Sequence, residues 1–427
     1  MNKSKLWNRN FFLLWQGQLT SELGIGVFNA IMGFWVLDIT GSLAMMGTIL
    51  ACQALPRVLL GPFAGAFSDR HSRKWIIVLT DLIRGLLFGG VGLSAIIMTR
   101  ANMPFPSILL YPVTVISGIM SAFFSPAIVS VIPDIVPVNK LTKANSLRAL
   151  SQAISNLAGF AGGGVLYSVL KGPSIVLFTG CAFVFSAITE VFISIPKTHR
   201  NIEKKNIMLE MWEGMKYTFR QKGIRTLITI GMFMNFFVNV GITLLSPLFK
   251  QEPGYGEAMY GAVMATMMCG QLVGMALVSL VKNRAKERAR LFYIAVIALI
   301  GAMIPVGLVF NVYIMFPLAL IIGTAVSIMT ILLYTLLQIT VHPDNRGRVF
   351  GIMSTAFEGL IPVAMAISGF AAELTGIRYA ILGSFSCAGI VLLFALVDRP
   401  FGVFLRSEPA VADTQTVAES TSDHPAV

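Results

Sequence analysis

Several charged residues lie inside long apolar stretches, where an ionisable side chain needs either a partner or a function, and three of them stand near the middle of such a stretch. Glu22 lies in the first stretch, Arg57 in the second and Glu358 near the C-terminal end of the chain. A carboxyl at membrane depth can take up and release a proton. We therefore predict Glu22 and Glu358 as proton-coupling residues. Arg57 would neutralise one of these carboxylates or bind an anionic substrate, and a purely structural Glu22–Arg57 pair is the alternative.

A fourth intramembrane charge, Glu190, lies about five residues from the end of its apolar stretch. We expect its side chain to extend to the membrane surface, as long charged side chains near the ends of spans commonly do. We assign it no role in coupling.

Uncharged polar residues recur at helical spacing on four of the apolar stretches. Residues three or four positions apart lie on the same face of a helix, so each series forms a polar stripe. The candidates for contact with a ligand are Gln18, Asn29, Ser121, Asn235, Asn239, Tyr334 and Gln338. The alternative is that each stripe binds a neighbouring helix, because hydroxyl and amide side chains hold membrane helices together.

The composition is that of a membrane protein. Of the 427 residues, 56% are hydrophobic and 12% are charged, whereas soluble domains carry about 25% charged residues. Apolar stretches of roughly 20 residues, each long enough to cross a bilayer as a helix, recur along the chain. The net charge of +12 is accounted for by loops that flank these stretches, so we expect no nucleic-acid partner.

The chain lacks the residue patterns of an enzyme or an ATP-driven pump. It contains no GxxxxGK[ST], HExxH or GxSxG motif, and its four histidines fall in loops or in the tail. The cysteines Cys52, Cys181, Cys269 and Cys387 are far apart and form no CxxC, which favours apolar filling over a disulfide or metal site. We therefore predict no enzyme activity, metal or cofactor.

Helices satisfy their own backbone hydrogen bonds and are therefore the expected membrane-spanning elements. We predict an all-α membrane protein with twelve spans in two pseudo-symmetric bundles of six. The spans are 11–37, 43–67, 75–98, 107–131, 145–170, 173–195, 224–249, 256–281, 291–311, 313–338, 349–374 and 377–397. The first bundle is 1–195 and the second is 224–400. Between them, 196–223 is a linker with a possible interfacial helix, and 401–427 is a tail without expected order.

Positive charge orients these spans. Most of the 32 Lys and Arg residues fall on the side of the membrane that carries the N-terminus; the exceptions outside the spans are Arg100, Lys171, Lys250 and Arg378. Basic loops remain in the cytoplasm, so we predict that both termini are cytoplasmic and that the protein lies in the cell membrane.

One short loop carries an unusual density of charge. The stretch Gly65–Lys74, GAFSDRHSRK, connects spans two and three on the predicted cytoplasmic side. Gly65 would allow two helices to approach closely, and Asp69 could meet the positive N-terminal end of a helix in the other bundle. The cations that could bind carboxylates or anionic lipid are Arg70, Arg73 and Lys74.

In the next span, Asp81 and Arg84 stand three residues apart in DLIRG, a spacing at which the two charges can pair. We expect this pair to join the network of the loop before it. A simple topological anchor is the alternative for the loop, but anchoring by the positive-inside rule does not need Asp69.

The loop resembles the signature G-x-x-x-D-[RK]-x-G-[RK]-[RK] of the major facilitator superfamily, with Ser72 in place of the second glycine. The resemblance covers about residues 5–400 and implies that spans one, four, seven and ten line a central cavity. It also implies that Gly65–Lys74, with Asp81 and Arg84, forms a cytoplasmic gate that releases as the bundles rock.

Further motifs resemble the drug:proton antiporter branch, which includes macrolide efflux and siderophore exporters. They are GFAGGGVL at Gly159–Leu166, with Phe160 where the antiporter signature has proline, and AFFSPAIVSVIPDIVP, LTKANSL and DNRGRVFGI. The resemblance implies proton-coupled export of hydrophobic or amphipathic drugs such as macrolides by a monomer. The alternatives are a siderophore or other metabolite exporter, and a receptor or scaffold that transports nothing.

Overall fold

The computed structural model describes residues 6–137, 140–194, 215–216, 218–280, 285–308, 311–341 and 343–406. Within these ranges the chain folds into helices joined by short connections, and no strand is present. The prediction of an all-α membrane fold is confirmed. Most of the linker 196–223 and all of 407–427 lie outside the described residues, so the predicted interfacial helix and the rest of the tail stay predictions.

Two sequential sets of helices form the molecule. The first set is α1 (Arg9–Thr40), α2 (Leu43–Arg70), α3 (Arg73–Arg100), the 3-10 turn η1 (Ser107–Leu109), α4 (Leu110–Ile135) and α5 (Leu141–Val191). The second set is α7 (Lys222–Gln251), α8 (Glu257–Leu280), α9 (Ala285–Leu308), α10 (Val312–Thr340), α11 (Pro343–Gly359), α12 (Ile361–Thr375), α13 (Ile377–Val397) and α14 (Arg399–Leu405).

Local sequence signals set the ends of these helices. The Asn8 side chain accepts a hydrogen bond of 2.9 Å from the Phe11 amide at the start of α1, which satisfies one of the free N–H groups there. Gly41 ends α1 with φ +65°, a left-handed conformation that glycine adopts without strain. The Ser42 hydroxyl then caps α2 by accepting from the Met45 amide. The tight α1–α2 connection follows from these two residues.

Eleven described helical segments are long and apolar enough to cross a membrane. One of them, 143–191, has 49 residues, which at 1.5 Å per residue is about twice the thickness of a bilayer core. The backbone of this segment breaks at Lys171, where φ is 62° and ψ is 167°. The segment therefore makes two crossings, and twelve crossings result, as the sequence predicts.

Span eleven is interrupted where the sequence EGLIP indicates a break, because α11 ends at Gly359 and α12 begins at Ile361. At the other end of the second set, the structure differs from the expectation. Residues 401–405, which we expected to open the unstructured tail, belong to α14. The Asp398 side chain caps this helix, and Phe401, Phe404 and Leu405 are buried. Burial of these three apolar side chains extends the folded chain to Arg406.

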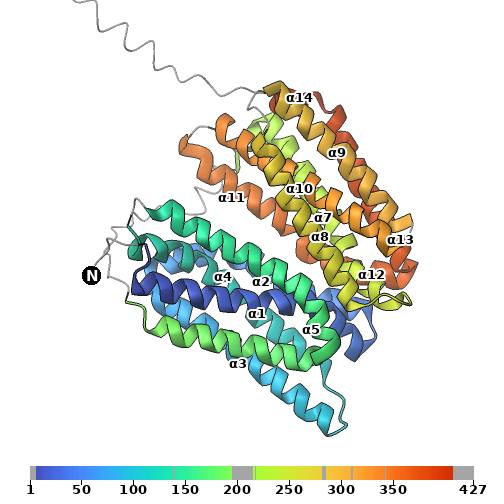
Figure 1. The fold of residues 1–427 in the computed structure, drawn as a ribbon. Coiled ribbons are helices and arrows are strands. Elements are labelled where there is room, and N and C mark those ends of the chain that lie inside the picture. Colours follow the sequence, from blue (N-terminus) through green and yellow to red (C-terminus); the bar gives the residue numbers. More distant parts are fainter. Residues whose placement is uncertain are drawn as a thin grey trace, which may run out of the picture.

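The two sets of helices form two bundles that lie side by side (Figure 1). We call the end where α1 begins and α14 ends the terminal face, and the end where α1 leads into α2 the opposite face. Most of the described contacts between the bundles lie toward the opposite face, where α2 packs against α12 and α5 against α8. Figure 1 shows the bundles diverging from there toward the N-terminus.

Glycines make the close contacts near the opposite face. A Cβ on Gly47 of α2 would lie 2.3 Å from the carbonyl oxygen of Met365, and one on Gly369 of α12 would lie 2.2 Å from that of Leu43. Between α5 and α8, a Cβ on Gly164 would lie 2.0 Å from the Glu257 carbonyl oxygen. Only residues without side chains allow backbones to approach this closely. The seal between the bundles therefore depends on these positions.

Candidate functional site

Arg57 and Glu358 form an ion pair between the two bundles. The Arg57 guanidinium on α2 lies 3.4 Å from the Glu358 carboxylate at the C-terminal end of α11, and both side chains are about half exposed. One turn before Arg57, the Gln53 amide donates to the Asn29 side chain of α1 at 3.2 Å. The sequence did not decide whether Arg57 pairs with Glu22 or with Glu358. The structure pairs Arg57 with Glu358.

Glu22 lies elsewhere, in the middle of α1, and is half-buried. The charges that act on its carboxylate are those of Arg148, Arg84 and Asp81. The purely structural Glu22–Arg57 pair considered from the sequence is therefore not what the structure contains. Gln18, one turn earlier on α1, has only 6% of its surface exposed, so it faces packed helices in this conformation.

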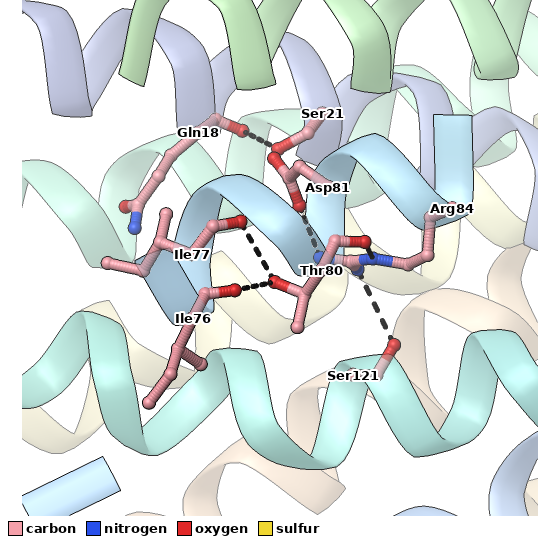
Figure 2. A network of polar contacts seen from close by, with 8 residues as sticks. All are labelled: Gln18, Ser21, Ile76, Ile77, Thr80, Asp81, Arg84 and Ser121. Atoms are coloured by element: carbon pink, nitrogen blue, oxygen red, sulfur yellow. Dashed lines mark hydrogen bonds and ion pairs between the residues drawn. The ribbon is translucent and has the colours of Figure 1, made fainter. Parts of the chain in front are cut away.

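Asp81 and Arg84 pair with each other as the i, i+3 spacing predicts, and both are buried. Figure 2 shows the Arg84 guanidinium between Asp81 on its own helix and Ser121 on α4, whose hydroxyl is 3.5 Å from Arg84 Nη1. The rings of Phe183 and Phe124 lie 4.4 and 4.6 Å from the guanidinium carbon. Aromatic faces stabilise a cation in this position. The pair is thus a buried contact among α3, α4 and α5.

Glu190 does not extend to the surface, and that expectation is wrong. Its side chain is buried, with 1% of its surface exposed. The end of α5 packs against α1 and α3, and this packing covers a carboxylate that its sequence position alone would leave at the membrane edge. Asp81 and Arg84 are the charged groups that act on it most strongly.

The polar stripes have different environments. On α7, the Asn235 and Asn239 side chains are half-buried and donate to carbonyls one turn earlier, at 2.9 and 2.8 Å. Such local bonds leave the amide oxygens available to a ligand. On α10, Tyr334 is 39% exposed and stacks on Phe350 at 5.6 Å. The Gln338 side chain lies outside the described residues, so its assignment stays a prediction.

The loop Gly65–Lys74 is described only in part. Arg73 donates to the Asp134 carboxylate of α4 at 2.6 Å, and Lys74 lies 5.9 Å from the ring of Trp75. Asp69 and Arg70 end α2, but their side chains are outside the described set, and their gate role stays a prediction. A Cβ on Gly65 would meet nothing within 4 Å. Among the residues that the structure describes, the close helix contact expected at Gly65 is not seen.

Two contacts that the sequence does not predict close the opposite face. Asp38 of α1 binds both Lys250 of α7 and the Tyr167 hydroxyl of α5. Glu373 of α12 accepts from the Ser42 hydroxyl at 2.8 Å and from the Ala44 amide at 2.9 Å. The one hint of this pair in the sequence is that Asp38 and Lys250 both follow directly after a predicted span, on the same side of the membrane. We call these two contacts the opposite-face clasp.

An apolar cavity of about 40 Å³ lies inside the second bundle, lined by Met264, Met267, Met303 and Met315 among others. Drug-sized ligands occupy pockets of about 300–1,000 Å³. This cavity is therefore too small to hold one, and the region between the bundles is the better candidate for a substrate.

Comparison with known proteins agrees with this architecture. Residues 14–364 match the family model described as Major Facilitator Superfamily. The chain is 26% identical over 386 residues to macrolide efflux protein A of Streptococcus pyogenes, covering 89% of this chain and 93% of that protein. It is 23% identical over 375 residues to the multidrug efflux pump Tap of Mycolicibacterium fortuitum, covering 84% and 88%.

Among solved structures, a bacterial homologue of the iron transporter ferroportin in the inward-facing state superposes with a TM-score of 0.69 at 16% identity, covering 92% of this chain and 100% of that one. This likeness shows the fold alone. The family model covers most of the chain, from the first crossing into the eleventh. Together with the twelve crossings, it shows that the chain belongs to the Major Facilitator Superfamily.

Proposed function

We propose that this protein is a proton-coupled secondary transporter that exports hydrophobic or amphipathic drugs such as macrolides from the cell. The observation that carries the proposal is the arrangement of the two bundles, which are joined at one face and apart at the other. Membrane-spanning helices of both bundles carry ionisable residues, and two of these pair across the gap. The names of the macrolide and multidrug efflux relatives support the substrate class. The absence of a P-loop from the sequence favours an ion gradient over ATP as the source of energy.

In this proposal the terminal face is cytoplasmic, because the basic loops are on that side, and the structure corresponds to a state open to the cytoplasm. Substrate enters between the bundles near Asn29, Asn235, Asn239 and Tyr334. The Arg57–Glu358 pair is half exposed there, so its separation costs little. Closure of the terminal face, with Asp69 and its neighbouring cations as the gate, then accompanies release of the clasp on the opposite face.

Accumulation of macrolides and cationic dyes in inverted membrane vesicles tests the proposal. We expect wild-type vesicles to accumulate at least one compound when a proton gradient is imposed, and an ionophore to abolish this accumulation. The Glu22→Gln protein should lose the dependence on the gradient, since an amide cannot carry the coupling proton. The matched control is Glu287→Gln at the start of α9, outside the proposed site, which should accumulate like wild type.

Two outcomes would contradict the proposal. If no compound accumulates under any gradient, drug export is wrong, and a metabolite panel becomes the next measurement. If Glu22→Gln accumulates drug with full sensitivity to the ionophore, Glu22 is not the coupling residue, although export itself stands.

A further inference from the structure

Glu190 is the most deeply enclosed acid whose role the proposed transport cycle leaves unexplained. It is 1% exposed, and among the described residues no donor meets hydrogen-bond geometry at either of its carboxylate oxygens, although the Ser186 hydroxyl lies close enough to act on it. Burial of an ionised carboxylate that lacks good donors costs roughly several kcal/mol, whereas burial of a protonated carboxyl costs far less. The enclosure of Glu190 therefore favours its neutral, protonated form.

The charged groups around Glu190 come from three helices. From α3, Asp81 and Arg84 act on it most strongly. From α1, Gly17 lies against it, and a Cβ there would be in ordinary contact with Glu190 Cγ at 3.5 Å, whereas Glu22, five residues further along α1, points in another direction around the helix. The α5 helix itself contributes Ser186 one turn before Glu190, and Arg148 from its first crossing acts on Glu22.

The cluster contains more acidic groups than cations. Asp81 and Glu190 are both buried, and Arg84 is the buried cation beside them. Arg84 already binds Asp81 Oδ1, while at Asp81 Oδ2 no described donor meets hydrogen-bond geometry and the Ser186 hydroxyl is a neighbouring donor. Two like charges that share one site cannot both ionise without a large cost, so one carboxyl holds a proton. Because Asp81 has the guanidinium, the proton belongs on Glu190.

We propose that Glu190 is a proton-binding site beside the Asp81–Arg84 pair, and that it exchanges its proton during the transport cycle. The site is distinct from Glu22, and its exchange step rests on the proposed proton-coupled transport. When Glu190 is deprotonated, the proton leaves to water, and the Arg84 guanidinium must divide its donors between two carboxylates.

Arg84 also links this enclosed site to α4. Its Nη1 atom reaches Ser121 at 3.5 Å, and its guanidinium carbon lies 4.6 Å from the Phe124 ring. Ser121 and Phe124 are half-buried on α4. A shift of α4 moves the contacts that hold Arg84, and so changes how well the guanidinium stabilises the Glu190 anion.

Infrared spectroscopy of the full chain in lipid nanodiscs tests the site without any substrate. We expect wild-type protein at neutral pH to show the carbonyl stretching band of a protonated carboxyl, which disappears in alkali. Incorporation of glutamate labelled with ¹³C at the side-chain carboxyl should shift this band. Glu190→Gln should remove it, whereas Glu22→Gln and Glu358→Gln should retain it.

Three infrared results would overturn the site: no such band in wild type, a band that the glutamate label leaves unshifted, or a band that persists in full in Glu190→Gln. The first two need no variant, so they hold even if Glu190→Gln does not fold. Loss of the band in Glu22→Gln with retention in Glu190→Gln would assign the proton to Glu22 and also refute the proposal.

The exchange step is tested in the inverted vesicles. Glu190→Gln should bind drug but lose most of its gradient-driven accumulation, and accumulation equal to wild type would refute exchange. The two proposals fail separately. A band that passes all the infrared criteria, in a protein that transports nothing, would leave the proton site standing and remove the transport function.

Discussion

At the scale of single residues, two intramembrane arginines form ion pairs in very different surroundings. Arg57 is about half exposed and pairs loosely with an acid of the other bundle. Arg84 is buried and holds an acid on its own helix, with two aromatic rings around it. An exposed pair contributes little to stability, whereas removal of one partner from a buried pair leaves an uncompensated charge.

We therefore expect Arg84→Met to be far more destabilising than Arg57→Met. Loss of the Arg84 guanidinium leaves the buried Asp81 carboxylate without its cation, which should cost about 3–5 kcal/mol. The matched change at Arg57 should cost about 0–1 kcal/mol. Thermal unfolding of the two purified variants in one detergent checks the difference. Equal unfolding temperatures would contradict the buried charge cluster.

The sequence revealed part of this cluster. The Asp81–Arg84 pair follows from their spacing on one helix, and the depth of Glu22 follows from its place in the first span. Glu190 was misjudged because its environment comes from α1 and α3, more than 100 residues away along the chain. The partner of Arg57 was left open for the same reason: Glu358 belongs to the other bundle. Local spacing predicts contacts within a helix, whereas contacts between helices depend on packing.

At the scale of elements, α2 shows how one helix can have two different environments. Its first half packs against α12, where a Cβ on Gly47 would overlap the Met365 carbonyl. Further along, Gly61 has nothing within 4 Å of its Cβ position. The sequence predicted the span 43–67 closely, because its apolar length and Ser42 cap are local features. It did not distinguish the two glycines, since both lie in similar apolar surroundings.

We expect Gly47→Ala to separate the bundles at the opposite face, and Gly61→Ala to leave them in place. The added methyl group at 47 must displace the backbone of α12, at a cost of about 1–3 kcal/mol. The same change at 61 meets open space and should be neutral or slightly stabilising, since alanine favours helix over glycine.

Electron paramagnetic resonance can measure this separation, with spin labels at Asn102 and Tyr379, one exposed site on each bundle, in a background without the native cysteines. The distance should lengthen in Gly47→Ala and remain unchanged in Gly61→Ala. A distance in Gly47→Ala identical to that of wild type would show that α12 absorbs the methyl group without rearrangement.

At the scale of the whole molecule, the clasp and the glycine contacts join the two bundles at one end. Asp38, Lys250, Ser42 and Glu373 all lie at that end, and each contact connects one bundle to the other. The two bundles, their order and their twelve crossings were predictable from hydropathy and charge. Which face is closed was not, because the sequence is the same in every state of the cycle.

If the bundles must part at the opposite face during transport, a covalent bridge there should stop it. We expect that linking Ser42→Cys to Glu373→Cys with a short reducible thiol reagent abolishes drug accumulation in vesicles, and that reductant restores it. The control links Glu252→Cys to Arg378→Cys, whose parent side chains form an ion pair between α7 and α13 within one bundle. Undiminished transport by fully linked Ser42→Cys/Glu373→Cys protein would rule out rocking about this contact.

The glycines of the closed face have one more consequence, which concerns rotamer freedom. A seal made of leucine or methionine would immobilise flexible side chains at each closure, at a cost of about 0.5–2 kcal/mol of conformational entropy apiece. Gly47, Gly164 and Gly369 have no side chain to immobilise. Closure of the face therefore immobilises no side chain at these positions, and opening of the face restores no rotamer freedom there. Two conformations joined by such a contact can remain close in free energy over many cycles of opening and closing.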